Sequence, residues 1–176
     1  MPSRLALANV AYLEQGVALL SRIDDAAYTA CSPPLYGSGV GGHLRHCLEH
    51  YRQLLDGLSE GRVDYDARGR DRRVERDRGL ALRQAKAIAS ALTALEEGLE
   101  GQVLMTRMDC GDGMRRETHW QRSTLGRELQ FMVSHTTHHY ALIALILRHQ
   151  GIEPGPTFGV AASTLQHARG LLTTRG

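Results

Sequence analysis

The sequence predicts an all-α protein, a four-helix bundle with a short β-hairpin between its third and fourth helices. Apolar residues recur every three or four positions along four long segments, as they do on the buried face of an amphipathic helix. Proline, glycine or dense charge separates these segments. With 176 residues the chain has the length of one ordinary domain, so we expect a single domain over residues 1–176.

Capping and breaking signals predict the first two helices. Ser3 can cap a helix whose apolar positions end before the break at Pro33 and Pro34. A second helix is expected from near Ser38 to about Gly61. Its entry, GSGVGG, either is flexible or lets the backbone approach another segment closely. This entry lacks the continuation of a phosphate-binding loop.

Residues 62–76 are dense in charge and poor in apolar periodicity, which predicts a solvated loop. Asp77 can then cap a third helix, whose apolar stripe runs from Leu80 to Leu99. The arginines of the loop either bind an anionic substrate or form an ordinary charged surface.

A β-hairpin is expected after the third helix. Two short runs, residues 102–108 and 114–120, flank a turn-forming sequence from Cys110 to Gly113. Gly and Asp in such a turn suit the tight connection between two antiparallel strands.

The fourth helix begins after a cap at Ser123 or Thr124 and is expected to run to about Gln150. A short helix capped near Ser163 follows in the tail. The fourth helix is almost wholly apolar over 141–147, which is more than one bundle core needs. This surplus predicts a homodimer, unless the hairpin and the tail cover it.

Composition excludes several classes of protein. The net charge of +2 gives no electrostatic case for nucleic acid or a membrane surface as partner. No apolar run reaches the roughly 18 residues of a membrane span. Three cysteines without a CxxC pair favour the reducing cytoplasm, and the N-terminal segment resembles an amphipathic helix more than a signal peptide.

The histidines are unevenly placed. Of the nine, His46 and His50 lie four residues apart on the second helix, and His135 and His139 lie four apart on the fourth. Such a spacing stacks two imidazoles on one helix face, where both can reach one metal ion. Random placement would give fewer than one such pair. Two pairs on two helices therefore point to a metal site between the helices.

Known metal motifs limit what this site can be. The zinc-protease motif HExxH is absent, because Thr136 follows His135 where that motif has glutamate. The ExxH pairs of di-iron bundles are absent too. Glu128 lies two turns before His135 on the same face, as either a hydrogen-bond acceptor that orients a ligand or a surface carboxylate.

Two stretches, VGGHLRHCLEHY and VSHTTHHYALI, resemble the two metal-binding signatures of the DinB-like superfamily. This superfamily includes bacterial thiol-dependent S-transferases and the N-terminal domains of mycothiol-dependent isomerases. The resemblance extends over roughly residues 5–150. It implies a four-helix bundle with up-down-down-up topology that is often dimeric.

The resemblance also implies a set of ligands. His46, His135 and His139 fall on the positions of the three metal ligands. His43 and His50 share the face of His46, so either can replace or supplement it. Tyr140 follows the last ligand where many members have glycine, which marks a difference near the substrate pocket.

Three neutral imidazoles leave coordination positions open, as in catalytic zinc sites. Such ligands favour zinc or nickel, with iron or copper as further options. The resemblance implies a metal-dependent enzyme, a low-molecular-weight-thiol S-transferase acting on an electrophile or a related hydrolase. A non-catalytic metal-binding or sensing protein and a dimeric helical module with a vestigial site remain open. Arg45, Arg52 and Tyr140 are the candidate substrate-binding residues.

Overall fold

The structure, a computed structural model, describes residues 1, 3–33, 37–109 and 119–173, and within them the chain is mostly helical, as predicted. A small sheet and short 3₁₀ turns accompany the helices. The helices are α1 (Arg4–Leu20), α2 (Asp25–Thr29), α3 (Val40–Gly57), α4 (Arg72–Arg76), α5 (Arg78–Thr93), α6 (Leu125–His149) and α7 (Ala162–Thr173). The strands are β1 (Arg62–Asp64), β2 (Val103–Arg107) and β3 (Gln121–Thr124), and the 3₁₀ turns are η1 (Tyr65–Ala67) and η2 (Leu99–Gly101).

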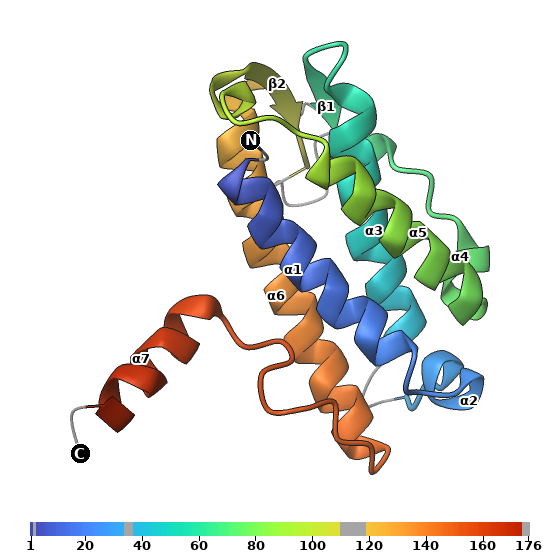
Figure 1. Ribbon diagram of the computed structural model, residues 1–176. Coiled ribbons are helices and arrows are strands. Elements are labelled where there is room, and N and C mark those ends of the chain that lie inside the picture. Colours follow the sequence, from blue (N-terminus) through green and yellow to red (C-terminus); the bar gives the residue numbers. More distant parts are fainter. Residues whose placement is uncertain (2, 34–36, 110–118, 174–176) are drawn as a thin grey trace.

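The long helices α1, α3, α5 and α6 lie side by side (Figure 1). Helix α1 contacts α5 and α6, and α3 contacts the same two helices. Their apolar stripes meet in one core, as the helical spacing of leucines predicts. The predicted cap of α1 is confirmed, because the Ser3 hydroxyl accepts a hydrogen bond from the backbone N–H of Ala6.

A buried polar cluster fixes the axial position of α3 relative to α6. The Tyr51 hydroxyl on α3 donates to Asn9 on α1 at 2.7 Å, and Thr136 on α6 donates to the Tyr51 oxygen at 3.0 Å. A buried polar group left unpaired costs about 1–3 kcal/mol, so these bonds hold one arrangement of the three helices. Since Tyr51 and Thr136 directly follow His50 and His135, the cluster also sets the two histidines at the same level.

The glycine-rich entry to α3 allows a close approach of two backbones. A Cβ on Gly41 would lie 2.2 Å from the carbonyl oxygen of Glu75, at the end of α4. Only a residue without a side chain fits there. Of the two roles open to this entry, the structure shows the close approach.

The sheet has the order β1-β2-β3, with β1 parallel to β2 and β2 antiparallel to β3. The antiparallel pair stands where the hairpin was predicted, and Leu104 pairs with Ser123 in its register. The strand that pairs with β2 is β3. The predicted turn at 110–113 and residues 114–118 of the predicted second run lie outside the described residues.

The prediction of a solvated loop over residues 62–76 is wrong. This segment holds β1, η1 and α4, and three of its side chains are buried: Val63, Tyr65 and Val74. Each buried residue is isolated among charged neighbours, so no periodic stripe marks the segment in the sequence. The predicted second and third helices are also too long, because α3 ends at Gly57 and α5 at Thr93.

The tail packs on α6 before it departs. Phe158 stacks on Tyr140 with ring centroids 4.7 Å apart. Helix α7 then extends away from the four long helices (Figure 1).

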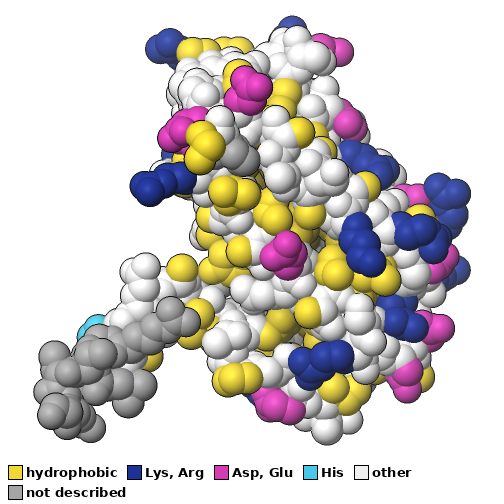
Figure 2. All heavy atoms as spheres, in the orientation of Figure 1, with side chains coloured by type: hydrophobic (Ala, Val, Ile, Leu, Met, Phe, Trp, Pro, Cys, Tyr) yellow, Lys and Arg dark blue, Asp and Glu magenta, His cyan; other side chains and the backbone are white. Residues whose placement is uncertain are grey.

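On the face drawn in Figure 2, basic and acidic side chains are interspersed on the side formed by α4 and α5. None of the described helices combines the length and the apolarity that crossing a membrane requires.

Candidate metal centre

Five histidines gather between α3 and α6. His43, His46 and His50 come from α3, and His135 and His139 come from α6. The centroid of the His46 ring lies 4.9 Å from that of His135 and 4.6 Å from that of His139. The two helices therefore turn their histidine-bearing faces toward each other, as the paired four-residue spacings predict.

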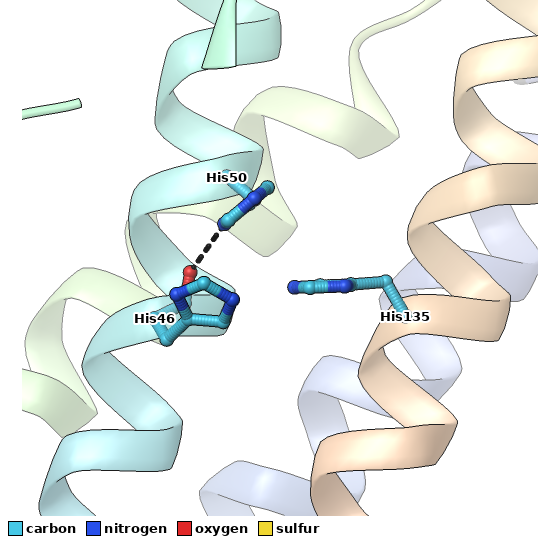
Figure 3. Close-up of side chains that lie close together, drawn as sticks. All are labelled: His46, His50 and His135. Atoms are coloured by element: carbon cyan, nitrogen blue, oxygen red, sulfur yellow. Dashed lines mark hydrogen bonds between the residues drawn. The ribbon is translucent and has the colours of Figure 1, made fainter. Parts of the chain in front are cut away.

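Three of these rings converge most closely. One nitrogen from each of His46, His50 and His135 lies within 4.8 Å of the other two. Figure 3 shows the rings of His46 and His135 reaching across the space between their helices, with His50 one turn along α3. A metal ion bonds each imidazole nitrogen at about 2.0–2.1 Å, so three donors at this separation need only small movements to share one ion.

Two features show that the donor atoms fit a metal. The Nδ1 of His50 donates to the backbone carbonyl of His46 at 2.8 Å, which leaves Nε2 of His50 as its lone-pair nitrogen. The Nε2 of His135 is buried and has no hydrogen-bond partner among the described residues. An unpaired buried polar atom is costly, and a bound cation would satisfy it.

The rings are held neutral. Burial, followed by the neighbouring histidines, lowers the pKa of His46 to about 2 and that of His135 to about 3. Burial also lowers the pKa of His139 to about 4, with His43 as the next cause, and lowers the pKa of His50. Neutral imidazole is the form that binds metal, so the ring nitrogens are available at neutral pH.

His139 and His43 form a pair at the side of this group. Their Nδ1 atoms lie 3.0 Å apart, so one ring donates its proton to the other. The His139 ring also lies 4.6 Å from the rings of both His46 and His135. The structure thus brings together all three ligands that the resemblance implied, and adds His50. Which of His50 and His139 binds a metal stays a prediction.

The sequence left two roles open for Glu128, and the structure places this side chain in the interior. Its carboxylate accepts hydrogen bonds from the Tyr65 hydroxyl at 2.7 Å and from the Ser123 hydroxyl at 2.5 Å. The Tyr65 ring stacks on His50, with centroids 5.5 Å apart. Glu128 therefore acts on the histidine group through Tyr65, and not through a bond to an imidazole.

Sequence reasoning missed Tyr65, Arg68 and Phe131. Tyr65 is the single aromatic residue in the charged segment 62–76, which was its only signal. Arg68 donates to the Tyr65 carbonyl at 2.8 Å, and its positive charge contributes to lowering the pKa of His46 and His135. The Phe131 ring, one turn before His135 on α6, lies 5.4 Å from the ring of that histidine.

Two of the three candidate substrate-binding residues, Arg45 and Tyr140, have partners outside the histidine group. Arg45 pairs with Glu49 at 3.0 Å and with Glu75 at 2.7 Å, which ties α3 to α4. Arg52 is exposed on α3. Tyr140 is buried in the core, where its ring stacks on Phe158 instead of on an imidazole of the histidine group.

Comparisons with known proteins place the chain in a family. A 112-residue segment is 32% identical to part of FK506-binding protein 5 of Rhizopus delemar, covering 61% of this chain but only 28% of that protein. No solved structure was found to match the chain. A family model described as the DinB superfamily matches residues 14–143, a range that contains all the clustered histidines of α3 and α6. The chain belongs to the DinB superfamily.

Proposed function

We propose that this protein is an enzyme that depends on a divalent metal ion, with zinc or nickel held by histidines of α3 and α6. One observation carries the proposal: His135 Nε2 is buried without a partner among the described residues, beside His46 and His50, whose nitrogens lie within 4.8 Å. We also propose that the four long helices form the up-down-down-up bundle that the resemblance implies.

In such a site the protein would supply three neutral histidines as ligands. When bound, the ion supplies positive charge that lowers the pKa of a thiol or a water toward neutrality. The Nδ1 bond of His50 to the His46 carbonyl fixes which nitrogen of His50 faces the ion. Tyr65 and Phe131 cover the rings of His50 and His135 with apolar surface, which limits the access of water.

The three-histidine ligand set and membership of the superfamily support a reaction class for this proposal. We infer a low-molecular-weight-thiol S-transferase, with a related hydrolase as the alternative. In the transfer, the sulfur forms a bond to an electrophilic carbon while the leaving group departs with the electron pair of its bond. A helical module with vestigial histidines is less well supported, because unused histidines would have no cause to converge.

Elemental analysis of the dialysed protein tests the metal. We expect one divalent ion per chain, and loss of that ion in His135→Ala. His138→Ala is the matched control, because His138 is exposed on the same helix. A metal content that stays at the control level in His135→Ala overturns the site.

A thiol panel tests the reaction. Each thiol is offered with 1-chloro-2,4-dinitrobenzene, and formation of the thioether is followed in wild type and in His135→Ala. Thiol-dependent turnover that disappears in the variant supports the transferase. Metal binding without turnover of any thiol would exclude the transferase and leave the hydrolase and the non-catalytic metal-binding protein as the alternatives.

The homodimer predicted from residues 141–147 also remains part of the proposal. Ile143, Ile146 and Leu147 are buried within the chain, whereas Leu145 is 63% exposed. Sedimentation of wild type and Leu145→Glu tests whether this residue lies in a contact between two copies.

A further inference from the structure

A cavity of about 360 Å³ opens beside the histidine group, between the sheet and the first turns of α6. Its lining includes three arginines, Arg107, Arg122 and Arg127, together with Tyr65, Phe131 and Glu128. This volume lies at the lower end of the range for small-molecule sites, about 300–1,000 Å³. A small metabolite fits it, and a macromolecule does not.

The cavity and the histidine group share two rings. Tyr65 stacks on His50, with centroids 5.5 Å apart, and Phe131 lies 5.4 Å from His135. Both rings also line the cavity. The same two side chains therefore border both the cavity and the histidine group.

The cavity carries surplus positive charge. Arg107 pairs with Asp64, and the Glu128 carboxylate is occupied by the hydroxyls of Tyr65 and Ser123. Within the described ranges, neither Arg122 nor Arg127 forms an ion pair with a carboxylate. A guanidinium fork matches carboxylate and phosphate groups. Arg122 and Arg127 outnumber the single Glu128 carboxylate of the same lining, so the cavity keeps a net positive charge that favours an anion.

The end of α6 adds to this preference. Arg127 and Glu128 stand in the first turn of this 25-residue helix, whose Thr124 cap accepts from the backbone N–H of Arg127 at 3.2 Å. The partial positive charge of a helix N-terminus favours a nearby anion. This effect reinforces the charge of the arginines.

We propose that this cavity binds the anionic end of a small organic substrate, a carboxylate or a phosphate group, through Arg122 and Arg127. The assignment rests on the proposed function in one respect: the anionic group belongs to the substrate that reacts at the histidines. Anion binding itself needs no metal, so the two proposals can fail separately.

The chain carries its own reporter for this test. Trp120 is the single tryptophan, and the Arg107 guanidinium lies 4.9 Å from its ring centroid. Succinate, its neutral isostere succinamide, and inorganic phosphate are titrated at constant ionic strength while the fluorescence of Trp120 is recorded. We expect a saturable change with succinate or phosphate and none with succinamide. Succinate as the stronger probe assigns a carboxylate, and phosphate as the stronger probe assigns a phosphate group.

Three variants locate the binding. Both Arg122 and Arg127 are exposed, so the double variant R122Q/R127Q should fold, and we expect it to bind the anion at least ten-fold more weakly. Arg83→Gln is the matched control, because Arg83 is an exposed arginine on α5, and it should bind as wild type does. In H46A/H135A the metal site is removed and the anion response should persist.

Four outcomes overturn the proposal. The first is the absence of a saturable change with either anion, and the second is an equal response to succinamide. The third is a response that survives in R122Q/R127Q. The fourth is a response that disappears in H46A/H135A, since that would place the anion on the metal. If His135→Ala loses its metal and the wild-type protein shows no anion response, the metal site is supported and anion binding in the cavity is excluded.

Discussion

His50 donates its Nδ1 proton to the backbone carbonyl of His46, one turn earlier on α3, at 2.8 Å. A carbonyl can only accept, so the bond fixes the tautomer of His50 and leaves its Nε2 with a lone pair. The two rings lie 4.3 Å apart, and one turn of α3 thus offers two imidazole donors. His135 completes the group from α6.

This relationship separates two possible ligand sets. The convergence of His46, His50 and His135 predicts that His50→Ala loses more metal affinity than His139→Ala, by at least ten-fold. Competition with a zinc chelator measures both affinities, and His138→Ala serves as the control. The reverse order would assign His139, as the resemblance implied, in place of His50.

Metal should stabilise the folded chain. An ion that binds only the folded state at one hundred times its dissociation constant adds about 2.7 kcal/mol to the free energy of unfolding. For a chain of 176 residues this corresponds to a rise in melting temperature of about 5–10 °C. Calorimetry with and without zinc measures it. H46A/H135A should show no rise, and a rise equal to that of wild type would mean that zinc binds elsewhere.

The stability of the metal-free protein should fall as pH falls. Burial lowers the pKa of His46 to about 2 and that of His135 to about 3, whereas an unfolded histidine titrates near 6.5. Below pH 6.5 the unfolded chain therefore binds protons that the folded chain does not. The free energy of unfolding should decrease by at most about 1.4 kcal/mol per pH unit for each such histidine.

Urea unfolding at pH 7.5, 6.5 and 5.5 measures this dependence. His135→Gln removes one titrating group, so its loss of stability between pH 6.5 and 5.5 should be smaller than that of wild type. A free energy of unfolding that stays constant over this range would show that the histidines titrate in the folded state as they do in the unfolded chain.

The close approach at Gly41 gives a test of the fold. A Cβ there would meet the Glu75 carbonyl at 2.2 Å and Tyr28 Cε1 at 2.9 Å, so Gly41→Ala should destabilise the protein by about 1–3 kcal/mol. Gly69→Ala is the control, because a Cβ on Gly69 would meet no described atom within 4 Å. Equal urea midpoints for both variants would contradict the approach of α4 to α3.

The sequence could predict what local spacing determines. The helical periods identified the long helices, and the four-residue spacing of His46/His50 and of His135/His139 put each pair on one face of its helix. Spacing could not predict contacts that form between distant segments. The pairing of β1 with β2 places Val63 opposite Thr106, and no pattern within residues 62–76 predicts that pairing. For the same reason the stacking of Tyr65 on His50 was not foreseen.

The Tyr65 ring contacts two sites, since it lines the cavity and also stacks on His50. A displacement of this ring on one side therefore changes the surroundings of the other. Thermodynamic linkage then requires reciprocity: the factor by which an occupant of the cavity alters affinity for an ion equals the factor by which the ion alters affinity for that occupant. Substitution of Tyr65 should therefore change the coupling between the two ligands as well as the affinity for each.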